Sequence, residues 1–157
     1  MEYTFFWASA TVSVLLLAAA AILKGTNLPV WIIGITSIAY SMVYEIIFGD
    51  RLGLYYYITP EESTLYILLG ALFIYTPLNI IFVIFLPESR KKILIYTVIW
   101  IGAMLVFEYA SVLTRSVVFT GWKPIPWSIV TYAATYTWII LFYKYMMRLA
   151  RRKSSPQ

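Results

Sequence analysis

Five apolar stretches divide the chain, and short polar stretches separate them. Each apolar stretch has about 20 residues, enough for a helix to cross the roughly 30 Å hydrocarbon core of a bilayer. Helices are required there because lipid offers the backbone no hydrogen-bond partner, so each backbone group must pair within its own segment. The pattern therefore predicts an all-α integral membrane protein, a single domain over residues 1–157. Its five transmembrane helices are expected at about residues 3–23, 28–48, 60–86, 93–113 and 126–147.

Several residues indicate where these helices begin and bend. Pro29 and Pro126 stand at helix starts, where a missing N–H costs no hydrogen bond. The spacing of Thr59 and Glu62 is that of a capping box, so the third helix is predicted to begin near residue 60. Pro77 lies within the third stretch and predicts a kink, because proline removes a backbone hydrogen bond and clashes with the preceding turn.

Composition supports a membrane protein and excludes some chemistry. Hydrophobic residues make up 62% of the chain and charged residues 12%, whereas soluble domains carry about 25% charged residues. We therefore expect a multi-pass protein of a cell membrane. The sequence contains no cysteine and no histidine. Thiol chemistry is thus excluded, the commonest metal ligand is missing, and we expect no metal and no cofactor.

Basic residues in the loops predict the orientation of the helices, because lysine and arginine gather on the cytoplasmic side. With the N-terminus outside and the C-terminus in the cytoplasm, nine basic residues lie inside and three outside. The start of the chain lacks the basic n-region of a signal peptide, so the first stretch is expected to remain as a span. The inner set is Lys24, Arg90, Lys91, Lys92, Lys144, Arg148, Arg151, Arg152 and Lys153, and the outer set is Arg51, Arg115 and Lys123.

Two acids, Glu45 and Glu108, lie inside predicted spans, and both fall in the outer third. A charge within the bilayer is costly, so such residues usually face the bundle interior. Polar stripes at helical spacing accompany them: Ser37, Ser41 and Tyr44 before Glu45, Ser111 and Arg115 after Glu108, and a third stripe on the last helix. Together they predict an outward-facing polar cleft. Its candidate residues are Ser41, Tyr44, Glu45, Glu108, Ser111, Arg115, Trp122, Lys123, Ser128 and Tyr132. No catalytic role is assigned to any of them.

Simpler interpretations exist for the same residues. Both acids can reach the polar interface of the membrane, and hydroxyl stripes commonly join helices. If the two acids instead meet inside the bundle, Arg115 is expected to neutralise them. Arg115 and Lys123 can also bind an anionic head group. Trp122, Trp127 and Tyr55–Tyr57 stand where an aromatic interface belt would fall.

The stretch EYASVLTRSVVFTGWKPIPWSIVTY resembles the C-terminal signature of a family of small membrane proteins of spore-forming Bacillota. In that family an acid in the penultimate helix precedes an aromatic loop with Trp-Lys and a serine that opens the last helix. Glu108, Trp122, Lys123 and Ser128 are the matching positions. The resemblance implies a five-helix protein of a bacterial cytoplasmic membrane, and the family has no established activity.

A second stretch, LGLYYYITPEESTLYIL, is similar to bacterial lycopene cyclase domains, in which an aromatic run precedes proline and two glutamates. That resemblance implies that Glu61 and Glu62 protonate a polyene and that aromatic side chains stabilise a carbocation. Here Pro60 and Glu61 are adjacent, whereas one residue separates the two in those domains. The capping box offers a structural role for Glu62 instead.

These observations favour a binding or accessory subunit of an envelope complex. The alternatives are a membrane enzyme acting on isoprenoids or lipids and a minimal transporter subunit, for which five spans would require oligomerisation. Expected partners are the lipid bilayer and a second copy of the chain or a larger membrane complex. No nucleic acid is expected, because the basic residues at 148–153 are explained by orientation and by contact with anionic lipid.

Overall fold

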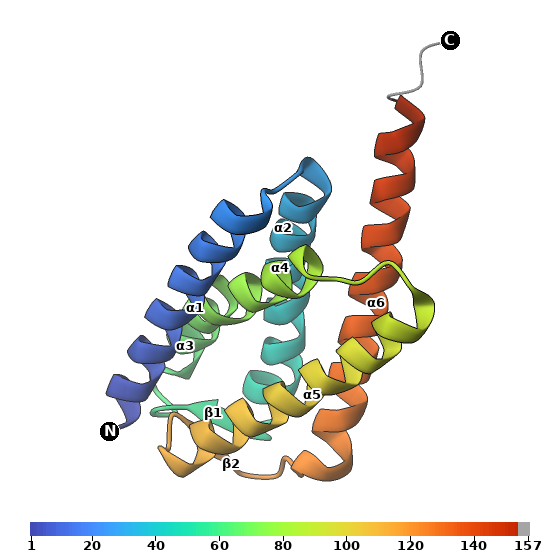
Figure 1. The fold of residues 1–157 in the computed structure, drawn as a ribbon. Coiled ribbons are helices and arrows are strands. Elements are labelled where there is room, and N and C mark those ends of the chain that lie inside the picture. Colours follow the sequence, from blue (N-terminus) through green and yellow to red (C-terminus); the bar gives the residue numbers. More distant parts are fainter. Residues whose placement is uncertain (154–157) are drawn as a thin grey trace.

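The structure, a computed structural model, describes residues 1–153. The side chain of Lys153, one of the nine inner charges counted above, lies outside the described part. Figure 1 shows long helices with a small strand pair at the end of the molecule where the N-terminus lies. The elements are α1 (Glu2–Lys24), α2 (Leu28–Glu45), the π-helical η1 (Ile46–Arg51), β1 (Tyr55–Tyr57), α3 (Ser63–Gly70), the π-helical η2 (Ala71–Tyr75), α4 (Thr76–Ile84), α5 (Arg90–Leu113), β2 (Val117–Phe119) and α6 (Pro124–Lys153).

The predicted helical fold is confirmed. Among the described residues, five helical segments are long and apolar enough to cross a membrane: Glu2–Lys24, Leu28–Arg51, Ser63–Ile84, Arg90–Leu113 and Pro124–Arg152. The second of them joins α2 to η1, and the third joins α3, η2 and α4. Each overlaps one of the five stretches predicted from the sequence.

The third helix begins later than predicted, at Ser63 instead of near residue 60. The backbone N–H of Glu62 does reach the hydroxyl of Thr59, at 3.4 Å. The Glu62 carboxylate, however, accepts a hydrogen bond from the Tyr3 hydroxyl at 3.3 Å. Because that carboxylate is engaged by α1, only half of the capping box forms, and residues 59–62 remain a turn.

Pro77 produces a local change of helix type within the third segment. Proline cannot donate a hydrogen bond to the carbonyl four residues earlier, and the preceding residues of η2 are wound as a π-helix. Such π-helical turns accommodate a proline within a helix, and they frequently occur at functional sites. A π-helical turn that includes Tyr75 thus stands directly before the proline at which the sequence predicts a kink.

The helices pack around α4, which contacts α1, α2 and α6. Gly34 of α2 permits a close approach to α4, because a Cβ atom at this position would lie 2.6 Å from Cδ1 of Ile80. Ile33, Phe82 and Tyr136 form the centre of the core between α2, α4 and α6. Helix α5 packs on α6 and on β2, and thus completes one wall of the interior.

The strands β1 and β2 were not predicted. They pair antiparallel, with Tyr55 opposite Phe119 and Tyr57 opposite Val117. The carbonyl of Leu54 extends the pair by accepting the backbone N–H groups of residues 120, 121 and 122, each at 3.0 Å. Tyr55 and Tyr57 are buried, so the prediction that they belong to an aromatic interface belt is wrong. Alternate residues of a strand point to one face, which turns both rings inward.

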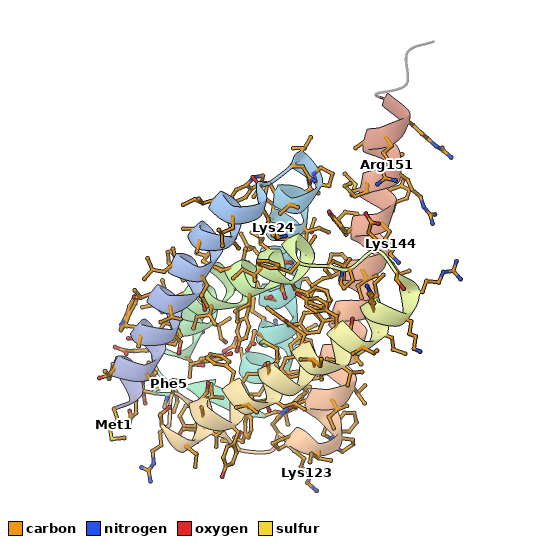
Figure 2. The ribbon with its side chains drawn as sticks, viewed as in Figure 1. Met1, Phe5, Lys24, Lys123, Lys144 and Arg151 are labelled. Carbon is orange, nitrogen blue, oxygen red and sulfur yellow. The ribbon has the colours of Figure 1, made fainter. Side chains whose placement is uncertain are left out.

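The outer surface of the helices is strongly apolar. In the most apolar part of α5 only 11% of the residues are buried within the protein. Leu94, Val98 and Val106 are largely exposed. Charged side chains lie towards the ends of the molecule: Lys123 is near the end that holds Met1, whereas Lys24, Lys144 and Arg151 are towards the other (Figure 2). A surface of this kind matches a bilayer, with apolar flanks and charged ends.

Candidate functional site

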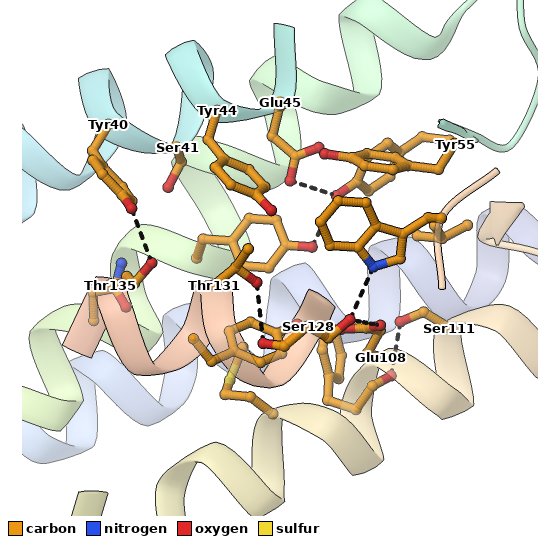
Figure 3. A pocket seen from close by; sticks show the side chains of 18 of the residues that line it. Tyr40, Ser41, Tyr44, Glu45, Tyr55, Glu108, Ser111, Ser128, Thr131 and Thr135 are labelled. Atoms are coloured by element: carbon orange, nitrogen blue, oxygen red, sulfur yellow. Dashed lines mark hydrogen bonds between the residues drawn. The ribbon is translucent and has the colours of Figure 1, made fainter. Parts of the chain in front are cut away.

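A cavity lies between α2, α5 and α6, near the end of the molecule that carries β1 and β2 (Figure 3). Including its open mouth, the cavity has a volume of about 850 Å³. The cavity is lined by Tyr40, Ser41, Tyr44, Glu45, Tyr55, Tyr57, Tyr75, Asn79, Met104, Phe107, Glu108, Ser111, Val117, Phe119, Trp122, Ser128, Thr131, Tyr132, Thr135 and Tyr136.

Glu45 is the last residue of α2 before the π-helical turn, and it is 8% exposed. Its Oε1 accepts a hydrogen bond from the Tyr57 hydroxyl at 3.1 Å. The Tyr75 hydroxyl lies 2.8 Å from that of Tyr57. Because Tyr57 has one proton and gives it to Glu45, Tyr75 must donate to Tyr57. Three side chains from α2, β1 and η2 thus form one hydrogen-bonded chain.

The second carboxylate oxygen of Glu45, Oε2, is buried and has no hydrogen-bond partner among the described residues. The Tyr55 hydroxyl interacts electrostatically with this carboxylate, but no hydrogen bond of ordinary geometry reaches Oε2. Burial, together with the nearby Glu45 charge, raises the pKa of Tyr55 and of Tyr57 above the usual value for tyrosine. Both hydroxyls therefore keep their protons and present donors or dipoles to Glu45.

Glu108 of α5 is half-buried, and both of its carboxylate oxygens are hydrogen-bonded. Oε1 accepts from the Ser128 hydroxyl at 2.6 Å, and Oε2 accepts from the Tyr132 hydroxyl at 2.7 Å. Both donors belong to α6, so Glu108 joins α5 to α6 across the cavity wall. The indole N–H of Trp122 in turn donates to the Ser128 oxygen at 2.9 Å.

Aromatic rings make up much of the remaining wall. Trp122 meets Tyr55 edge to face, with ring centroids 5.8 Å apart, and contacts Phe48 and Tyr44 in the same manner. The Tyr44 hydroxyl is buried and has no hydrogen-bond partner among the described residues. The strand pair holds Tyr55 and Tyr57 against this cluster, because β1 is tied to β2 and to the loop that leads to Trp122.

Most residues predicted for the cleft line this cavity, and two do not. Ser41, Tyr44, Glu45, Glu108, Ser111, Trp122, Ser128 and Tyr132 are in its wall. Arg115 and Lys123 are exposed and outside it. Helix α5 ends at Leu113 and Arg115 has a left-handed backbone (φ 58°), so Arg115 does not continue the helical face of Glu108. Within the described part of the chain no salt bridge to either acid is present.

Several lining residues were not singled out from the sequence. Tyr40 and Tyr136 lie one helical turn from Tyr44 and Tyr132, so the same spacing that gave the polar stripes could have found them. Tyr75 and Phe119 carry no such signal. They reach the cavity through the π-helical turn and through strand pairing, which depend on contacts far along the chain. Met104, Phe107 and Val117 are ordinary apolar wall residues.

The arrangement of these side chains indicates an acidic cavity lined by aromatic rings, but it does not indicate a particular reaction. In the described residues no group of three or more acidic side chains is placed to hold a metal ion. The polar groups of the cavity wall are two carboxylates, several hydroxyls and the amide of Asn79, and aromatic rings surround them. The molecule is thus a five-helix protein with an acidic, aromatic cavity. No known protein family, curated protein or solved structure matches the chain, and these comparisons bear on neither resemblance noted from the sequence.

Proposed function

We propose that this protein crosses a cell membrane five times, with its N-terminus outside, and binds a small, partly apolar molecule in the cavity as a binding subunit. The observation that carries the proposal is the cavity itself: two acids from different helices share one space, and one of them has an unpartnered, buried oxygen. A buried polar atom without a partner is costly to the folded protein. A bound molecule with a hydrogen-bond donor would remove that cost.

The position of the cavity supports an outward opening. Glu45 lies six residues before the end of its span and Glu108 five residues before the end of its own. At about 1.5 Å of rise per residue, both are within roughly 9 Å of the same membrane boundary. In the orientation that the loop charges favour, this boundary is the outer one.

The polyene chemistry implied by the second resemblance is not the function that we propose. Glu61 and Glu62 are exposed and outside the cavity. Glu62 is engaged by Tyr3 and by the turn of Thr59.

A cavity-filling variant tests the proposal. Ser41 lines the cavity and its hydroxyl makes no hydrogen bond to another described residue, so Ser41→Phe fills space without breaking a contact. We expect the purified protein in phosphatidylcholine nanodiscs to bind at least one of a set of small aromatic amines, alcohols and acids, and Ser41→Phe to bind it at least tenfold more weakly. Equilibrium dialysis measures both affinities. If no compound distinguishes the two proteins, the cavity is not a binding site and the proposal is wrong.

A further inference from the structure

The cavity holds two carboxyl groups and, among the residues that line it, no basic partner for them. Glu45 and Glu108 are in its wall, and no lysine or arginine is among its lining residues. Arg115, the residue expected to neutralise them, is exposed. In a region shielded from water an uncompensated carboxylate strongly favours a nearby positive charge.

The two acids differ in what they can offer a ligand. Both oxygens of Glu108 are already occupied by Ser128 and Tyr132. Glu45 uses Oε1 for Tyr57 and leaves Oε2 without a partner. Glu45 is thus the acid with an oxygen that accepts no hydrogen bond from another described residue. The Tyr44 hydroxyl, on the neighbouring residue, is also unpartnered and can accept a second one.

The aromatic wall narrows the ligand class further. Tyr44 and Tyr55 lie beside Glu45 in the cavity wall (Figure 3), and the ring of Trp122 meets each of these two tyrosines edge to face. Aromatic faces attract cations, and the attraction grows where water is excluded. The same rings pack well on an apolar or aromatic body. A metal ion would need more oxygen ligands than the two carboxylates supply.

We propose that the ligand of this cavity is a protonated primary or secondary amine on a small apolar body, with its N–H group bound to Glu45 Oε2 and its charge against Tyr44, Tyr55 and Trp122. This inference rests on the proposed binding function and names its ligand class. A quaternary ammonium ion fits less well, because it has the charge but no N–H for Oε2.

Four probes of similar size test the inference in phosphatidylcholine nanodiscs, whose lipids have no net charge. They are 2-phenylethylamine, its N,N,N-trimethyl derivative, 2-phenylethanol and phenylacetate. We expect the unmutated chain to bind 2-phenylethylamine at least tenfold more tightly than 2-phenylethanol, the trimethyl derivative with intermediate affinity, and phenylacetate most weakly. This comparison requires no variant and so does not depend on how a mutant folds.

Glu45→Gln then locates the interaction. It should weaken binding of 2-phenylethylamine at least tenfold and change binding of 2-phenylethanol less than twofold. Glu61→Gln is the matched control, because it removes the same charge from an exposed turn outside the cavity; it should leave both affinities unchanged.

The failures of the two proposals are distinguishable. If 2-phenylethanol binds as tightly as the amine, and Ser41→Phe weakens the binding of 2-phenylethanol, the amine inference is overturned while the cavity remains a binding site. An amine preference that persists in Glu45→Gln also overturns it. If neither probe distinguishes the unmutated chain from Ser41→Phe, the binding function itself is wrong.

Discussion

Glu108 illustrates how a carboxylate inside a helical bundle can be structural. Its two oxygens hold Ser128, which is 1% exposed, and Tyr132, and these bonds join α5 to α6. Glu108→Gln should be tolerated with a loss below about 1 kcal/mol, because an amide and two reorientable hydroxyls can re-form both bonds. Glu108→Leu leaves both hydroxyls without this acceptor and should lower the free energy of unfolding by about 1–3 kcal/mol per buried group.

Unfolding of the detergent-solubilised protein, followed by circular dichroism, measures both losses. Glu61→Leu makes the same replacement at an exposed position and should have little effect. Equal destabilisation by the glutamine and leucine variants would contradict this account, because it would show that the charge of Glu108 matters and its hydrogen bonds do not.

At the residue scale the sequence located the acids well and their partners less well. The cost of an acid in a span singled out Glu45 and Glu108, and helical spacing linked them to Ser41, Ser128 and Tyr132. It could not show that Arg115 leaves the helical face, because that depends on where α5 ends. Nor could it show that a tyrosine of β1 holds Glu45, since that contact follows from the folded loop.

The approach of α2 to α4 depends on a single small residue. A side chain at Gly34 would collide with buried Ile80 and contact Thr76. Gly34→Leu should therefore destabilise the protein by about 1–3 kcal/mol through overpacking. Thermal unfolding of the variant measures the loss.

Gly102 of α5 provides the matched control, because nothing lies within 4 Å of a Cβ atom built there. Gly102→Leu should have no destabilising effect and can stabilise the helix slightly, since glycine is a poor helix former. If Gly102→Leu is as harmful as Gly34→Leu, helix propensity or lipid contact explains the loss, and close packing of α2 on α4 does not.

At the element scale, apolar length alone predicted all five helical segments, because an apolar stretch of about 20 residues is a strong local signal. The strand pair was out of reach for the opposite reason. Three residues of β1 pair with three of β2 far along the chain, and no local pattern specifies that pairing. At Pro77 the sequence predicted a kink and not the π-helical turn before it, since proline indicates where a helix is disturbed but not how the backbone adjusts.

The whole molecule combines an apolar flank with charges towards two ends, and this arrangement makes its membrane orientation testable. The chain has no cysteine, so single cysteines report position without background. Asp50→Cys lies in an exposed stretch at the β1 end, and Ser89→Cys lies in the exposed loop before α5. Val98→Cys lies on the apolar flank of α5, where the side chain is 61% exposed in the isolated protein.

Bacterial cells expressing these variants are treated with a membrane-impermeant maleimide before and after permeabilisation. Nine inner charges against three outer ones predict that Asp50→Cys reacts in intact cells and that Ser89→Cys reacts only after permeabilisation. Val98→Cys should react in neither case, because the thiol is covered by lipid and its thiolate does not form there. The reverse pattern for the first two would turn the cavity towards the cytoplasm. Reaction of Val98→Cys as fast as that of Asp50→Cys would show that the flank of α5 faces water and that the helix does not span the membrane.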